Sequence, residues 1–242
     1  MEANVHNSFK RRVVEFLLKN SNKKKIIIAL TGKKRSGKTY HGQYLVEKHG
    51  FTKLAFADKL KELLKEHFNI ELIKPEDIDS LERLNKIKII SKTYSTVDVK
   101  KRLIDALSEL FDPAIAFNFC NTERADKFIK MIKNIDNTND LRHIYQYFGS
   151  EICRYIDDEI WIKAYDKQIQ RIDNNLIVTD DVRFYNEYKC IEKYPHLFVY
   201  INNNYVLKDE HISENVEHLK TFADIIINNN YKRSNNYQKV SL

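Results

Sequence analysis

The sequence contains few residues that bend or cross-link a chain. Its 242 residues include only five glycines, three prolines and three cysteines. Because glycine adopts positive φ at little cost, most turns here must form without that freedom, and a cluster of glycines needs an explanation. Three of the five, Gly32, Gly37 and Gly42, fall within eleven residues.

The cysteines exclude two kinds of cross-link. Cys120, Cys153 and Cys190 are odd in number and far apart, with no CxxC spacing for zinc. This pattern gives no disulfide framework and is typical of buried thiols in a reducing compartment.

Long apolar runs are also missing. No run of about 18 apolar residues occurs, and the polar, basic N-terminus lacks the apolar segment of a signal peptide. We therefore expect a cytoplasmic protein with no membrane partner. The composition, 43% hydrophobic and 31% charged, is that of a folded globular chain, and the length fits one domain or one domain that carries an insertion.

The net charge of +7 is concentrated at one end of the chain. Residues 1–25 hold seven Lys or Arg against two Glu, so this leading arm carries +5. An evenly basic surface would favour nucleic acid as a partner. The uneven distribution argues against a nucleic-acid partner, except one bound through the arm 1–25.

Hydrophobic periodicity predicts short buried strands separated by helices. Residues 9–19 have the pattern of a basic amphipathic helix, and residues 58–171 are helical in period throughout. Short apolar runs predict five strands, at 26–30, 52–57, 175–180, 197–201 and 223–227. Strands joined by helical crossovers predict an α/β fold with a five-stranded parallel sheet flanked by helices.

The glycine cluster belongs to a phosphate-binding motif. The string GKKRSGKT at 32–39 matches G-x-x-x-x-G-K-[ST], with a predicted strand before it and a helix after it. Gly32 and Gly37 let the backbone turn its N–H groups toward a phosphate at the positive end of the helix. Lys38 reaches the β- and γ-phosphates, and Thr39 offers a hydroxyl to Mg²⁺. The expected nucleotide-binding residues are Gly32, Lys34, Arg35, Ser36, Gly37, Lys38 and Thr39, with ATP and Mg²⁺ as cofactors.

Two further polar clusters are candidates for the acceptor site. The segment TDDVRFYNE follows the predicted strand 175–180, which places Asp181, Arg183 and Glu187 at the carboxyl edge of the sheet, where Asp181 could hold Mg²⁺. Gly149 interrupts a helical stripe seven residues after Arg142. The alternatives are a solvent-exposed turn at 180–183 and an exposed helix arginine at 142.

The charges of these clusters favour a phosphate as acceptor. A phosphate oxygen is already ionised and needs cations rather than a general base, whereas a hydroxyl acceptor would require a positioned base. The candidate sites contain several cations and one acidic cluster. The expected catalytic residues are Lys38, Arg142, Arg183 and Asp181.

Four blocks of the sequence resemble the phage-type deoxynucleoside monophosphate kinases of the P-loop kinase superfamily. They are GKKRSGKT, LAFADKLKE at 54–62, LRHIYQYFGSEICRYIDDEIWIKA at 141–164, and TDDVRFYNE followed by DEHISE at 209–214. The blocks occur in the family's order over residues 25–228. The sequence departs from the family at Thr39, where the family often has Asp, and in lacking a closing helix after Asn228.

The resemblance implies a fold similar to that of P-loop nucleoside monophosphate kinases. We expect a leading arm at 1–25, set apart by its charge, and a flexible tail at 229–242, where the chain has little apolar content. The resemblance implies a kinase domain at 26–228 between them. Within the kinase domain we expect a helical acceptor-binding insertion at about 59–172 and a lid at about 202–214, with Lys208 as a cation of that lid. His211 either belongs to the lid or is merely exposed. The implied substrate-binding residues are Lys34, Arg35, Arg142, Gly149, Trp161, Asp181, Arg183 and Glu187; for Trp161, a place in the core is the alternative.

The expected function is transfer of the γ-phosphoryl group of ATP, with Mg²⁺, to a deoxynucleoside or ribonucleoside monophosphate, which yields the diphosphate. Two alternatives stay open: a kinase for a small phosphorylated molecule such as phosphomevalonate, and a non-catalytic P-loop protein that binds nucleotide as a structural partner. A homodimer is a further open expectation.

Overall fold

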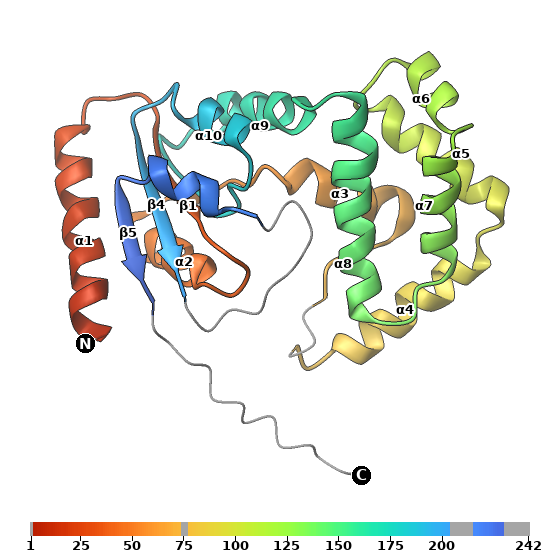
Figure 1. Cartoon of the computed structure of the whole chain (residues 1–242), viewed down its shortest axis with the longest axis horizontal. Helices are drawn as coiled ribbons and strands as arrows, with labels where there is room; N and C mark the ends of the chain where they lie inside the picture. Colours follow the sequence, from red (N-terminus) through yellow and green to blue (C-terminus); the bar gives the residue numbers. More distant parts are fainter. Residues whose placement is uncertain (1, 74–76, 204–214, 230–242) are drawn as a thin grey trace, which may run out of the picture. The chain divides into compact units, whose positions relative to one another are not determined.

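The computed structural model describes residues 2–73, 77–203 and 215–229, with side chains from residue 8 onward (Figure 1). The chain forms two compact units, each described here by itself. Unit 1 comprises Met1–Ala55 and Gln170–Leu242, and unit 2 comprises Phe56–Ile169. Most of the predicted lid, with Lys208 and His211, and all of the predicted tail except Asn229 lie outside the described residues.

Unit 1 is built on a five-stranded sheet in which every pair of neighbouring strands is parallel. The strand order is β2-β3-β1-β4-β5. The strands are β1 (Ile26–Thr31), β2 (Thr52–Lys53), β3 (Leu176–Thr179), β4 (His196–Asn202) and β5 (Ile225–Asn228). All six residues of β1 are buried, as expected for a central strand covered on both faces. The predicted α/β fold with a five-stranded parallel sheet and flanking helices, like that of P-loop nucleoside monophosphate kinases, is confirmed.

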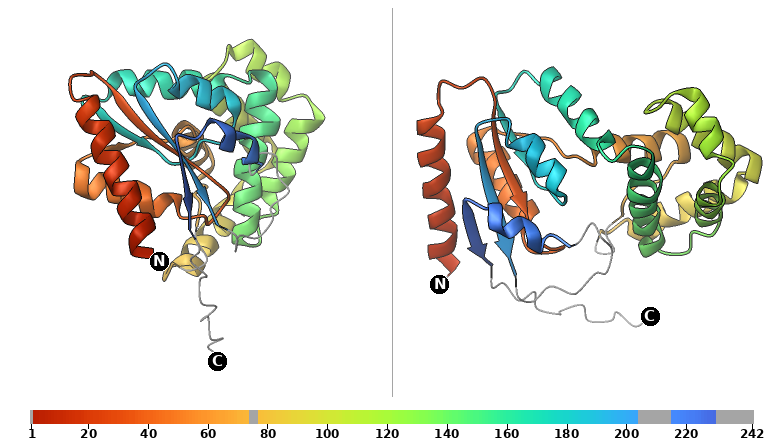
Figure 2. Two further views of the ribbon diagram at one scale, coloured as in Figure 1. Left: turned by 60° about the vertical axis from the view of Figure 1, so that its left-hand side comes forward. Right: turned by 45° about the horizontal axis from the view of Figure 1, so that its top comes forward.

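Helices of unit 1 cover the sheet and one of its edges. They are α1 (Glu2–Lys19), α2 (Lys38–His49), α10 (Tyr185–Ile191) and a 3₁₀ helix, η3 (Glu217–Phe222). Helix α1 lies beside the edge strand β5 (Figures 1 and 2). Its Phe9 and Val13 are fully buried with residues of β1 and β4, and the Phe9 ring meets His41 of α2 edge-on at 4.8 Å. Helix α1 is therefore part of the core of unit 1.

Unit 2 is helical and has its own hydrophobic core. Its elements are α3 (Asp58–Phe68), α4 (Ser80–Thr93), α5 (Thr96–Ser108), α6 (Pro113–Phe119), α7 (Glu123–Lys133), α8 (Thr138–Gln146), a π-helix η1 (Tyr147–Arg154) and most of α9 (Ile160–Arg171). Capping boxes start α5 at Ser95 and α8 at Asn137. At the centre, the Phe128 ring lies 5.4 Å from both Phe68 and Phe148.

Strand β2 and helix α1 differ most from the elements that periodicity predicts. The expected strand 52–57 is only two residues long, because β2 is an edge strand that pairs with β3 at Thr52 and Lys53 alone. The apolar residues that follow it, Leu54 to Phe56, are buried outside the sheet. Helix α1 starts at Glu2 rather than near Phe9.

The three cysteines are free and buried. Burial raises the pKa of Cys120 to about 11 and also raises that of Cys153, so both thiols are protonated near neutral pH. Among the described residues, no helix is both long enough and apolar enough to cross a membrane.

Candidate active site

The phosphate-binding motif lies at the carboxyl edge of the parallel sheet. It leaves the end of β1 and leads into α2, which begins at Lys38. Gly32 and Gly37 have φ of +141° and +109°, and Arg35 has φ of +64°. Such values are uncommon for residues other than glycine and tend to occur at ligand-binding turns. The two motif glycines therefore occupy backbone positions that favour glycine.

The loop has no room for a side chain at Gly32. A Cβ there would lie 2.3 Å from the carbonyl oxygen of Ile201 in β4 and 2.8 Å from the Ser36 hydroxyl. The loop therefore lies directly against the backbone of the neighbouring strand, which only glycine permits. The Ser36 Oγ is buried and has no hydrogen-bond partner among the described residues, which is unusual for a buried polar atom.

The side chain of Lys38 reaches back to the start of this loop. Its ammonium donates hydrogen bonds to the carbonyl oxygens of Gly32, at 2.6 Å, and Lys33, at 2.8 Å. Ser36 N donates to the Lys33 carbonyl, which closes a turn beneath the ammonium. The positive charge of Lys38 thus lies over backbone that leads into the N-terminus of α2, where the helix dipole adds to it.

Polar residues that follow β3 reach the same edge of the sheet. Strand β3 is the direct neighbour of β1, and the buried Thr31 hydroxyl donates to the carbonyl oxygen of Val182 at 2.7 Å. Asp181 and Arg183, on either side of Val182, are partly exposed. The structure thus brings the phosphate-binding loop and the Asp181–Arg183 segment to neighbouring strand ends, as parallel strands require.

Glu187 serves the backbone of that segment. The residue is 3% exposed, and its carboxylate accepts hydrogen bonds from the N–H groups of Arg183, at 2.7 Å, and Phe184, at 3.1 Å. These contacts satisfy donors at the start of α10. Glu187 therefore fixes the backbone that carries Arg183.

Asp180 is a second buried acid at this edge. Its carboxylate is 8% exposed and pairs with the ammonium of Lys53 at 2.7 Å. A Cβ at Gly42 would lie 3.6 Å from this carboxylate, so Asp180 also contacts α2. The Asp180–Lys53 pair connects the ends of β2 and β3 to the helix that follows the phosphate-binding loop.

A further ion pair connects the loop to the helix η3. The Lys33 ammonium lies 2.7 Å from the Glu217 carboxylate of η3. This contact with Lys33 holds the pKa of Glu217 below its usual value, although burial opposes the shift. Burial, with the same carboxylate nearby, raises the pKa of Tyr200 to about 12, so the phenol stays protonated. Sequence patterns did not indicate Glu217, because no local motif marks it.

Lys34 and Thr39 of the loop are partly exposed and exposed, respectively, whereas three further predicted residues lie in unit 2. Arg142 is on α8 and is partly exposed. Gly149 is in the π-helix η1, where a Cβ would meet Leu60 at 3.1 Å. Trp161 is 4% exposed, and its indole N–H donates to the carbonyl oxygen of Gly149 at 3.0 Å. Since π-helices are rare and frequent at functional sites, this segment is a notable feature of unit 2.

Replacing Trp161 by Phe should destabilise unit 2. The Trp161→Phe variant leaves the buried Gly149 carbonyl without its donor, which costs about 1–3 kcal/mol. Thermal or urea unfolding measures this loss. Tyr155→Phe is the matched control, because Tyr155 is 63% exposed and should change stability by less than about 0.5 kcal/mol. Wild-type stability of Trp161→Phe, together with lost use of the acceptor, would contradict this structural role.

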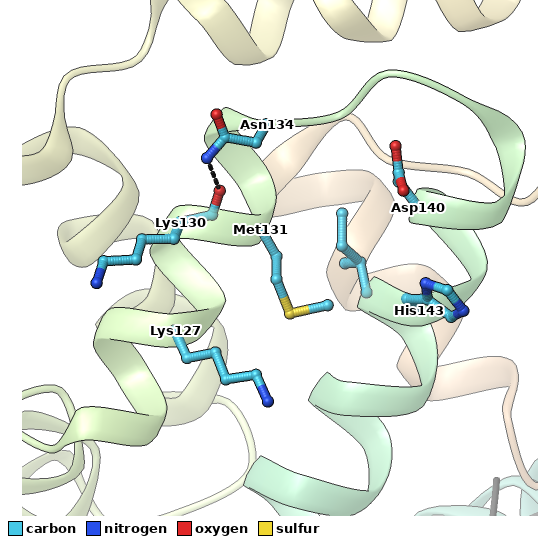
Figure 3. A pocket seen from close by; sticks show the side chains of 7 residues that line it. Lys127, Lys130, Met131, Asn134, Asp140 and His143 are labelled. Atoms are coloured by element: carbon cyan, nitrogen blue, oxygen red, sulfur yellow. Dashed lines mark hydrogen bonds between the residues drawn. The ribbon is translucent and has the colours of Figure 1, made fainter. Parts of the chain in front are cut away.

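One surface hollow of unit 2 lies between α7 and α8 (Figure 3). It measures about 320 Å³ and is lined by Lys127, Lys130, Met131, Asn134, Asp140, His143 and Ile144. Figure 3 shows the Lys130 ammonium pointing away from its centre. The Asp140 carboxylate accepts the N–H groups of Asp136 and Asn137 at the start of α8. None of the residues predicted to bind nucleotide or acceptor lines this hollow.

Comparison with known proteins identifies the family. The sequence model of deoxynucleotide monophosphate kinases matches residues 25–240. The chain belongs to the deoxynucleotide monophosphate kinase family. This membership confirms the resemblance drawn from the four sequence blocks and identifies a kinase whose substrates include a nucleotide. A comparison with curated protein sequences gives no significant match. Helix α1 precedes the matched region.

Proposed function

We propose that this kinase transfers the γ-phosphoryl group of ATP to a deoxynucleoside or ribonucleoside monophosphate and releases the diphosphate. The observation that carries the proposal is the loop at 32–39, in which two positive-φ glycines turn the backbone beneath the Lys38 ammonium at the N-terminus of α2. Backbone donors and a cation in this arrangement suit a polyphosphate.

Within this proposal, the loop residues bind the triphosphate. The backbone of Gly32 to Gly37 offers N–H donors, and Lys38 leaves its two carbonyl partners for the β- and γ-phosphates, which are stronger acceptors because they are charged. Lys34 and Arg35 extend the positive charge of the loop toward the phosphates. Holding the donor in this way supplies both orientation and charge stabilisation.

The site also offers oxygen ligands suited to Mg²⁺. Thr39 is exposed on the first turn of α2, and Asp181 is partly exposed after β3, whereas the Asp180 carboxylate is buried against Lys53. Hydroxyl and carboxylate oxygens are the donors that Mg²⁺ prefers. We propose Thr39 and Asp181 as its protein ligands, where the ion would neutralise charge on the β- and γ-phosphates.

Arg142 and Arg183 are the proposed cations for the acceptor phosphate. A monophosphate acceptor needs its negative charge neutralised before it can approach the donor. The two arginines belong to different units, so each is tested by its own variant. Gly149, Trp161 and Glu187 are proposed as further residues of the acceptor site: Glu187 fixes the backbone at Arg183, and Trp161 donates to the carbonyl of Gly149. The lid, the tail and a homodimer stay predictions.

An acceptor panel tests the proposed function. The full chain is assayed with ATP and Mg²⁺ against each deoxynucleoside and ribonucleoside monophosphate and against phosphomevalonate, with ADP release as the readout. We expect turnover on at least one deoxynucleoside monophosphate. Turnover on phosphomevalonate alone would contradict the nucleotide acceptor. ATP binding without turnover on any acceptor would instead support a nucleotide-binding structural protein.

The Arg142→Ala and Arg183→Ala variants should impair use of the acceptor more than binding of ATP. Loss of a charged hydrogen bond to phosphate costs about 1.5–3 kcal/mol, so we expect the acceptor kcat/KM to fall about 10- to 100-fold. Arg124→Ala is the control, because this arginine of unit 2 pairs with Glu151 at 2.9 Å and is outside the proposed site. If both variants keep the wild-type kcat/KM for every acceptor, the assignment of the acceptor site is wrong.

A further inference from the structure

The phosphate-binding loop is supported by a residue far from it in the sequence. Asn229 follows the last residue of β5, and its side-chain amide donates a hydrogen bond to the carbonyl oxygen of Ser36 at 2.8 Å. The two residues are 193 positions apart. A Cβ at Gly37 would lie 2.6 Å from the same amide nitrogen, so the Asn229 side chain lies directly against the loop.

The backbone of Asn229 is fixed by the sheet. Its N–H donates to the carbonyl oxygen of Asn202 at the end of β4, at 2.8 Å, which extends the parallel pairing of β4 with β5 by one bond. Next to it, the Asn202 side-chain amide donates to the Asn228 side-chain oxygen at 3.1 Å. The amide of Asn229 is thus presented to Ser36 from a rigid strand end.

The hydrogen bond from Asn229 to Ser36 also orients the next N–H group of the loop, that of Gly37. The C=O and N–H of one trans peptide lie in a plane and point in opposite directions. Because the Ser36 carbonyl is held toward Asn229, the Gly37 N–H of the same peptide must point away from Asn229. Gly37 is the residue immediately before α2, and its N–H is one of the donors expected to meet a phosphate.

We propose that Asn229 is a positioning residue for the phosphate-binding loop. It holds the peptide between Ser36 and Gly37 in the orientation that directs the Gly37 N–H to the phosphates of the donor nucleotide. Its effect on catalysis rests on the proposed function, whereas its effect on the loop itself does not.

Two Asn→Asp variants test this role. Asn229→Asp has the same shape as the native residue but replaces the amide donor with a carboxylate oxygen that repels the Ser36 carbonyl. Asn228→Asp is the matched control: it adds the same charge one residue earlier, at an exposed position, and keeps the oxygen that accepts from Asn202. We expect Asn229→Asp to raise the KM for ATP about 10-fold or more, with the KM for the acceptor nearly unchanged, and Asn228→Asp to resemble the wild type.

A second measurement does not depend on catalysis. Amide hydrogen exchange of a peptide covering residues 32–38 should be faster in Asn229→Asp than in the wild type and in Asn228→Asp, at equal melting temperature. Unchanged exchange in this peptide would overturn the proposal, and so would a parallel loss of melting temperature, ATP use and acceptor use. Faster exchange in a protein with no kinase activity would retain Asn229 as the support of the loop and reject the proposed function instead.

Discussion

Lys38→Ala should lower kcat about 10²- to 10³-fold while the chain remains folded. The Lys38 ammonium is the cation placed over the phosphate-binding loop, where it donates to the carbonyl oxygens of Gly32 and Lys33. Removing one preorganised group that stabilises transition-state charge typically costs this much. ADP release at saturating ATP and acceptor measures the effect.

Lys48→Ala is the matched control for this prediction. Lys48 is an exposed lysine in the last turn of the same helix, so its removal changes the net charge equally but does not touch the loop. We expect it to keep the kcat of the wild type. Undiminished turnover in a folded Lys38→Ala variant would contradict the assignment of the loop as the phosphate site.

Gly32→Ala should destabilise unit 1 and abolish tight ATP binding. The added Cβ would lie 2.3 Å from the Ile201 carbonyl oxygen, and the φ of +141° is strained for alanine. Overpacking and backbone strain each cost about 1–3 kcal/mol, so we expect a loss of about 2–6 kcal/mol unless the loop moves. If it moves, the loss appears as weaker ATP binding. Urea unfolding and ATP titration together detect both outcomes.

The Gly50→Ala variant separates the cost of backbone strain from the cost of the steric contact with Ile201. Gly50 ends α2 with φ of +68°, and a Cβ there would meet no atom within 4 Å. This variant should therefore cost only the backbone strain, about 1–2 kcal/mol, and bind ATP normally. A Gly32→Ala variant that matches Gly50→Ala in both stability and ATP affinity would show that the contact with Ile201 does not restrict the loop.

The fold was largely predictable because its signals are local. Each buried strand is a short apolar run, and the run Ile26 to Leu30 stops at the first glycine of the phosphate motif. Strand β2 was overestimated, because Leu54 to Phe56 are as apolar as a strand but bury their side chains outside the sheet. An apolar sequence indicates burial, whereas pairing depends on which neighbour is available.

The candidate site was predictable only where a motif marks it. GKKRSGKT identifies the loop, and TDDVR identifies the acids at the end of β3. The supports of the loop, Glu217 and Asn229, reach it only through the pairing of β4 with β5 and the placement of η3. No spacing in the sequence encodes these contacts, because they join residues about 190 positions apart.

Helix α1 belongs to the folded core of unit 1 although it lies outside the residues that the family model matches. The family match begins at residue 25, yet Phe9 is fully buried and meets His41 in the helix that follows the phosphate-binding loop. A chain cut at the family limit would expose that side of α2 and the edge of β5 to solvent. We therefore expect a chain that begins at the family limit to be less stable than the full chain, because it would lose the buried Phe9 and Val13 from the core of unit 1.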